Sequence, residues 1–280
     1  MSGHADRPNY GTHPARPTQP YTAEELEQLR ADAEQVVARY PQKRSALLPL
    51  LHLVQSVDGY ISPRGIEFCA EALGLTGAEV SGVATFYTQY KRFPNGDYSI
   101  GVCTNTLCAV VGGDAIWEAV SSHLGIGHDE TTTDGRITLE RLECNAACDY
   151  APVVMANWEF FDNQTPASTV AMVDALRAGE DVRPTRGPDK VHTFKEISRV
   201  LAGFPDGHAG EGPAAGEASL RGVRLAAEQG WTAPVAQQQE QTEASAAGES
   251  GAGMTAGRPS SADTPANAPD EKPGDGKIDR

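Results

Sequence analysis

The chain has 280 residues, of which 39% are hydrophobic, and a formal net charge of −15 at pH 7. This charge argues against a nucleic-acid partner, because phosphates repel an acidic surface and no cluster of Lys and Arg offsets the repulsion. No apolar run is long enough to cross a bilayer, and the first residues do not resemble a secretion signal. The sequence therefore predicts a cytoplasmic protein without direct membrane insertion.

Hydrophobic residues are concentrated in the middle of the chain. Residues 1–20 are rich in Pro, and residues 205–280 consist mainly of Ala, Gly, Glu, Gln, Ser and Pro. Such segments cannot bury enough apolar area to offset the entropy lost on folding. We therefore expect a flexible arm at 1–20, a disordered acidic tail at 205–280, and a folded part between them.

Residues 21–90 predict a helical bundle. Thr22 with Glu25, and Thr76 with Glu79, have the spacing of capping boxes, and Ser62-Pro63 combines an N-cap with a proline at the first helical position. Pro49 is expected to bend the second helix near its start. The predicted helices cover residues 21–40, 43–57, 63–74 and 76–85.

Residues 91–180 predict a small sheet covered by helices. Alternating apolar residues indicate a first strand at 98–103, and a helix follows from about 114 to 124. A second strand begins at Ile137, a hairpin turns at Asn157, and a helix runs from Thr165 to Gly179. The order β-α-β-β-α is that of a thioredoxin-like sandwich, so the fold class is α+β. Residues 181–204 are predicted to be a linker with a short helix.

Four of the five cysteines form two close pairs, each just after a predicted strand. Cys103 and Cys108 are joined by a predicted loop, Thr104 to Leu107, and Cys144 and Cys148 are separated by three residues. Two thiolate pairs can hold the two irons of a [2Fe–2S] cluster, or one tetrahedral zinc ion. We favour the cluster over zinc because the folded core is large enough to be stable without a structural metal ion. A redox-active disulfide is a further alternative, but neither cysteine spacing is C-x-x-C.

The remaining candidates have structural interpretations. Cys69 lies on the apolar face of a predicted helix and is expected in the core. His52 lies in a leucine-rich helix and is expected to be a buried imidazole with satisfied hydrogen bonds. The apolar stripe at 47–57 predicts core, with a docking face as the alternative. No G-x-G-x-x-G or Walker A segment is present, so no nucleotide site is predicted.

Several segments together resemble one family, the E subunits of respiratory NADH-quinone oxidoreductase (complex I). The resemblance covers about residues 21 to 180, and its segments occur in the family's order. They are YPQKRSALLPLLHLVQ at 40–55, VATFY at 83–87, VCTNTLC at 102–108, TTDG at 132–135 and ECNAACDYAP at 143–152.

This resemblance implies an electron-transfer subunit without a substrate-binding site of its own. It implies that Cys103, Cys108, Cys144 and Cys148 hold one [2Fe–2S] cluster. The implied partners are the flavoprotein subunit that binds FMN and NADH and other peripheral-arm subunits, on the cytoplasmic side of the membrane. The alternatives are a subunit of an NAD-linked hydrogenase or formate dehydrogenase, a free-standing ferredoxin, or a zinc-stabilised interaction protein.

The sequence departs from the family at two places. Asn145-Ala146 stands where the family usually has Leu-Gly. If that glycine requires a positive φ, alanine strains the loop by roughly 1 kcal/mol, which affects stability or potential more readily than ligation. The acidic tail lies outside the resemblance, and no role is predicted for it.

Overall fold

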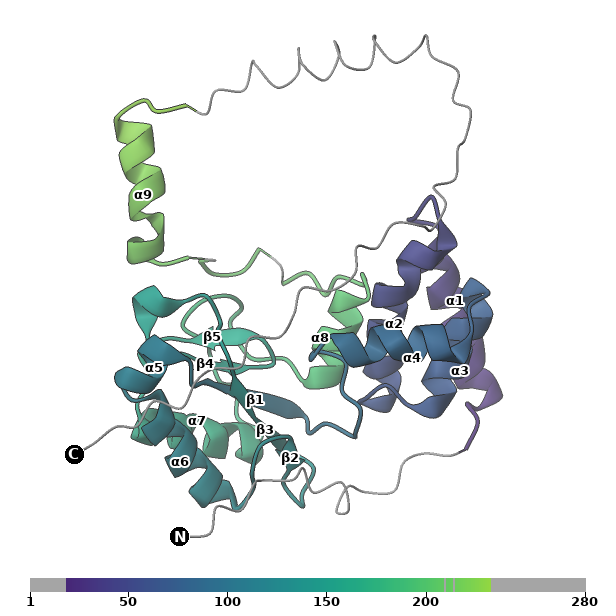
Figure 1. The fold of residues 1–280 in the computed structure, drawn as a ribbon, viewed down its shortest axis with the longest axis horizontal. Coiled ribbons are helices and arrows are strands. Elements are labelled where there is room, and N and C mark those ends of the chain that lie inside the picture. Colours follow the sequence, from purple (N-terminus) through teal and green to yellow (C-terminus); the bar gives the residue numbers. More distant parts are fainter. Residues whose placement is uncertain (1–18, 209, 214, 233–280) are drawn as a thin grey trace, which may run out of the picture. The chain divides into compact units, whose positions relative to one another are not determined.

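The computed structural model describes residues 19–208, 210–213 and 215–232 (Figure 1). Residues 1–18 of the predicted arm and 233–280 of the predicted tail lie outside this part. None of the helices in the described part combines the length and apolar character needed to span a bilayer.

The N-terminal helical bundle forms as predicted. Thr22 and Thr76 each cap a helix and complete the predicted capping boxes with Glu25 and Glu79. Pro49 lies in the first turn of its helix, just after a 3-10 turn at Lys43–Ala46. There its missing N–H removes no hydrogen bond within α2, and the bend near Pro49 stays a prediction. The helices are α1 Ala23–Val37, α2 Leu47–Asp58, α3 Pro63–Leu73 and α4 Gly77–Phe86.

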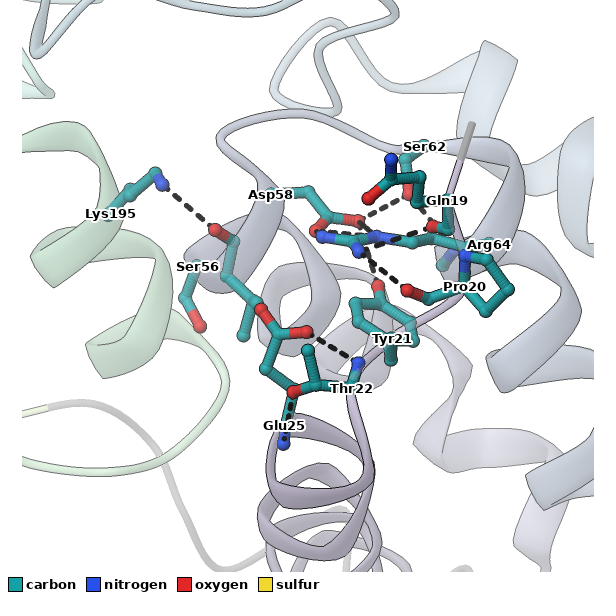
Figure 2. Close-up of polar contacts among 12 residues, drawn as sticks. Gln19, Pro20, Tyr21, Thr22, Glu25, Ser56, Asp58, Ser62, Arg64 and Lys195 are labelled. Carbon is teal, nitrogen blue, oxygen red and sulfur yellow. Dashed lines mark hydrogen bonds and ion pairs between the residues drawn. The ribbon is translucent and has the colours of Figure 1, made fainter. Parts of the chain in front are cut away.

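A buried ion pair joins α2 and α3 and contacts the segment just before α1 (Figure 2). The Asp58 carboxylate has no exposed surface and accepts hydrogen bonds from Arg64 Nε at 3.1 Å, from Tyr21 Oη at 2.8 Å and from Ser62 Oγ. The Arg64 guanidinium also lies 4.0 Å from the Tyr21 ring centroid and donates to the Gln19 carbonyl. Because the carboxylate is paired and fully hydrogen-bonded, its burial is tolerated.

Helix α8 (Phe194–Leu201) lies far along the chain but packs on α2. Lys195 Nζ donates to the Val57 carbonyl at 2.9 Å (Figure 2), and Arg199 Nη1 donates to Asp32 Oδ2 of α1 at 2.8 Å. The short helix was predicted, but its segment was assigned to a linker. Its contacts make it part of the helical core.

The sheet has five strands in the order β2-β3-β1-β4-β5, and β1 and β3 are parallel. The prediction missed β2, because two residues are too short to show an alternating pattern. The strands are β1 Tyr98–Cys103, β2 Glu130–Thr131, β3 Ile137–Leu142, β4 Val154–Ala156 and β5 Glu159–Phe161. The predicted turn at Asn157 is confirmed, since Asn157 and Trp158 have φ of 46° and 70° between β4 and β5.

Helices α6 (Gly113–Leu124) and α7 (Pro166–Ala178) pack together and share one apolar core with the sheet. This core is separate from that of the helical bundle, and both belong to the α+β architecture expected for a bundle followed by a thioredoxin-like domain. The fully buried side chains of the core shared by the sheet, α6 and α7 include Ile100, Val102, Ile116, Val120, Ile137, Leu139, Val173 and Leu176.

A polar joint connects the bundle to the sheet. Gln55 of α2 is fully buried, and its side chain accepts from Lys91 N at 2.9 Å and donates to the Gln89 carbonyl at 3.1 Å. The Lys91 side chain forms an ion pair with Glu140 of β3, whose other carboxylate oxygen accepts from Ser99 Oγ. The joint therefore anchors β3, the strand that leads to the second cysteine pair.

Helix α9 (Glu217–Glu228) forms within the stretch for which composition predicted disorder. Leu220 and Val223 are spaced as on one side of a helix, a local pattern that average composition does not register. None of its residues is buried, so it adds nothing to the cores described above.

Candidate metal centre

Two parallel strands bring the cysteine pairs to one edge of the sheet. Cys103 is the last residue of β1 and lies opposite Leu142, the last residue of β3, and Cys144 follows two residues later. Thr104 N donates to the Leu142 carbonyl at 3.0 Å, which continues the pairing beyond the strands. Because neighbouring parallel strands end at the same edge, both thiol pairs leave the sheet at one place.

The first pair is buried. Cys103 N donates to the Val153 carbonyl at 3.1 Å, and Cys103 Sγ lies 3.8 Å from the Glu143 carbonyl oxygen. Cys108 lies in a short helix, α5 (Thr106–Val110), whose N-cap Asn105 accepts from Thr106 N at 2.6 Å. The predicted loop from Thr104 to Leu107 is therefore wrong in its second half, because the Asn105 side chain starts a helix before Cys108.

Gly113 allows the backbone to close around the first pair. A Cβ at this position would lie 2.5 Å from the Cys103 carbonyl oxygen and 2.8 Å from that of Cys108. Real Cβ atoms do not approach backbone oxygens so closely. The absence of a side chain at the start of α6 therefore permits the backbone of Cys103 and the backbone of Cys108 to lie close to Gly113.

The second pair is exposed on a strained loop. Ala146 has φ of 52°, and its N–H donates to Cys144 Sγ at 3.3 Å. Cys148 begins a 3-10 turn, Cys148–Tyr150. The loop therefore has the positive φ at residue 146 on which the predicted strain of Ala146 depends.

The thiols influence each other's protonation. Burial, and then the neighbouring Cys103 thiol, raise the pKa of Cys108 to about 11. The pKa of Cys148 is also raised, first by desolvation and then by Cys144 and Cys103. A bound cation would reverse these shifts, since a coordinating thiol is deprotonated.

The donor chemistry fits an iron–sulfur cluster. Thiolate sulfur is the ligand of [2Fe–2S] clusters, and it also suits zinc. Among the residues that the structure describes, no group of three or more His, Cys, Asp or Glu side chains lies close enough together to hold a single metal ion.

An apolar shell surrounds the first pair. Ala147 and Val153 are buried with Cys103 and Cys108, and Phe160 of β5 packs against them. The sequence pattern did not associate Val153 and Phe160 with the cysteines, because it indicated only that both residues belong to a hairpin. Their proximity to the thiols follows from the pairing of β4 with β1.

Two candidates lie away from this centre. Cys69 is fully buried in the core of the bundle, as predicted, and burial raises the pKa of its thiol to about 12. His52 is also buried, and burial lowers the pKa of its imidazole to about 4. The prediction of a satisfied imidazole is wrong, because His52 Nδ1 has no hydrogen-bond partner among the described residues.

The family model that matches this chain agrees with this chemistry. The family model described as thioredoxin-like [2Fe-2S] ferredoxin matches residues 33–177. The E subunit of the Mycobacterium bovis NADH-quinone oxidoreductase is 57% identical over 215 residues, which are 76% of this chain and 85% of that protein. NADH-quinone oxidoreductase subunit 2 of Thermus thermophilus is 38% identical over 168 residues, or 59% of this chain and 93% of that protein. The solved structure of an NAD+-reducing [NiFe]-hydrogenase has a TM-score of 0.44 and 21% identity, covering 48% of this chain and 23% of that chain.

Proposed function

The chain belongs to the thioredoxin-like [2Fe–2S] ferredoxin family, among the E subunits of NADH-quinone oxidoreductases, and from this premise we propose that Cys103, Cys108, Cys144 and Cys148 hold one [2Fe–2S] cluster. The observation that supports this ligand set most directly is the parallel pairing of β1 with β3. It delivers one thiol pair from each strand to the same edge of the sheet.

The chain is an electron-transfer subunit of NADH-quinone oxidoreductase. When bound, the cluster supplies a one-electron carrier. The protein supplies the sulfur ligands, the N–H of Ala146 directed at Cys144 Sγ, and the apolar shell of Val153 and Phe160 that limits access of water to the first pair. Hydrogen bonds to sulfur and burial are the features by which a protein adjusts the potential of such a centre.

The partner is the flavoprotein subunit that binds FMN and NADH, together with other peripheral-arm subunits on the cytoplasmic side of the membrane. The similarity to the Mycobacterium bovis and Thermus thermophilus proteins supports this assignment. A subunit of an NAD-linked hydrogenase or formate dehydrogenase would have the same cluster but a different partner. Co-purification with the flavoprotein and a quinone-reducing complex distinguishes the respiratory assignment from a hydrogenase, a formate dehydrogenase and a free-standing ferredoxin.

Metal analysis of the anaerobically purified full chain tests the ligand set. About two irons and two acid-labile sulfides per chain are expected, as in any [2Fe–2S] protein. Cys103→Ser should lose most of both, whereas the matched control Cys69→Ala should keep them, because Cys69 lies in the other core. One zinc per chain without sulfide would overturn the proposal.

A further inference from the structure

A largely buried arginine lies beside the second cysteine loop, outside the region that the family model matches. Arg186 follows α7, beyond residue 177. Only 12% of its side chain is exposed, and only 8% of the side chain of its partner Asp162. Arg186 Nη2 donates to Asp162 Oδ1 at 2.9 Å, and Nε lies 2.9 Å from Oδ2 without the alignment of a hydrogen bond.

The guanidinium lies beside two aromatic rings that belong to different parts of the metal centre. Its central carbon is 4.0 Å from the centroid of Phe160 and 5.6 Å from the centroid of Tyr150. Tyr150 shares a 3-10 turn with Cys148, and Phe160 packs against the buried first pair. One side chain therefore links the turn of the exposed pair to the shell of the buried pair.

The arginine is held rigidly from its own side as well. Thr185 N donates to the Phe160 carbonyl at 2.9 Å, and Asp162 N donates to Thr185 Oγ1 at 3.0 Å. Asn163 N donates to the Tyr150 carbonyl at 2.9 Å, so the backbone of the cysteine turn is tied to the same segment. A planar, pre-positioned guanidinium loses little further freedom when it stacks on a ring.

We infer that Arg186 is a positioning residue, which holds the Tyr150 turn and therefore Cys148 in the geometry that the cluster requires. Its charge is paired with Asp162, so it acts mainly through stacking and packing rather than through a long-range field. This inference rests on the proposed function, since it assumes that Cys148 ligates a [2Fe–2S] cluster. Mutation of groups that orient metal ligands typically reduces metal affinity 10- to 100-fold.

The test compares Arg186→Leu, Arg186→Lys and the surface control Arg183→Leu in the full chain. Arg183 is 68% exposed and pairs with Asp189 at the surface. The readouts are the anaerobic rate of iron release to a chelator, the EPR g values of the reduced cluster and its midpoint potential. Arg186→Leu should release iron about tenfold faster and alter the EPR spectrum. Arg186→Lys should behave similarly, because an ammonium retains the charge without the planar stacking surface.

Tyr150→Leu provides a second variant that leaves the Arg186–Asp162 pair in place. It should accelerate iron release and change the g values in the same way, so the inference remains testable if Arg186→Leu does not fold. Wild-type release rates and g values in Tyr150→Leu and in every soluble Arg186 variant would overturn it. Full rescue by Arg186→Lys would also overturn it, because charge alone would then suffice. Failure of the proposed function is recognised separately, because wild-type protein would then contain no iron and sulfide.

Discussion

The N–H of Ala146 donates to Cys144 Sγ at 3.3 Å, and this contact occurs on a residue whose φ is 52°. Left-handed backbone is unfavourable for alanine by roughly 1–2 kcal/mol. The loop therefore combines backbone strain with a hydrogen bond to a proposed cluster ligand. Both properties belong to residue 146, but only the strain depends on its side chain, because the hydrogen bond uses the backbone N–H.

Ala146→Gly should stabilise the chain by about 0.5 kcal/mol, because relief of the strained φ exceeds the extra entropy of glycine in the unfolded state. The measurement is urea unfolding of the metal-free full chain. Ala147→Gly is the matched control, since Ala147 is buried and has φ of −120°. It should destabilise by about 0.5–1 kcal/mol. Equal shifts of the two variants would show that φ at residue 146 is not the source of strain.

Arg64→Met should strongly destabilise the helical bundle, because it leaves the Asp58 carboxylate buried without its cation. We expect a loss of about 3 kcal/mol in the free energy of unfolding, as for other broken buried ion pairs. Arg30→Met is the control, because Arg30 and Glu71 are both largely exposed and such pairs contribute less than about 1 kcal/mol. Similar losses in the two variants, measured by urea unfolding, would contradict the role of burial.

His52 should make stability dependent on pH. Its pKa is about 4 in the folded chain, against about 6.5 in the unfolded chain. Between pH 4 and pH 6.5 the unfolded chain binds the His52 proton more readily than the folded chain does. The contribution of neutral His52 to the free energy of unfolding is therefore complete above pH 6.5 and is lost as pH falls towards 4. From pH 7 to pH 5 the loss should be about 2 kcal/mol.

His52→Leu should remove this part of the pH dependence, because leucine does not titrate. Unfolding free energies of the wild type and the variant at both pH values provide the comparison. If the variant loses as much stability as the wild type between pH 7 and pH 5, the histidine does not cause the effect.

The order in which thiols react should report the arrangement of the metal centre. In metal-free folded chain, iodoacetamide should modify exposed Cys144 and Cys148 before buried Cys103 and Cys108. Cys69 should react only after unfolding, because it is buried and its pKa is raised to about 12. Peptide mass spectrometry at successive times measures the order. Early modification of Cys69 would contradict its place in the core.

Local patterns predicted most of the elements. The capping boxes at Thr22 and Thr76 lie within single turns of chain, so their effect does not depend on distant residues. The turn at Asn157 and the two cysteine pairs are likewise short-range features. Together with the family resemblance, they were sufficient to predict the α+β fold and the proposed ligand set.

Contacts between distant segments were not predictable in this way. The approach of Cys103 to Cys144 depends on the register of β1 with β3, and the packing of α8 on α2 joins residues more than a hundred positions apart. The same holds for Arg186, whose neighbours Tyr150 and Phe160 come from a turn and a strand earlier in the chain.

The sequence by itself therefore determined most of the helices and strands, although not β2, α5 or α9, and it determined which sulfur atoms are available as ligands. Only the tertiary structure decided that one thiol pair is buried and the other exposed, that Ala146 is strained, and that His52 Nδ1 lacks a partner among the described residues. The physical reason is that propensity and capping act over a few residues, whereas burial, hydrogen-bond satisfaction and the pKa of a thiol depend on everything that surrounds the group in space.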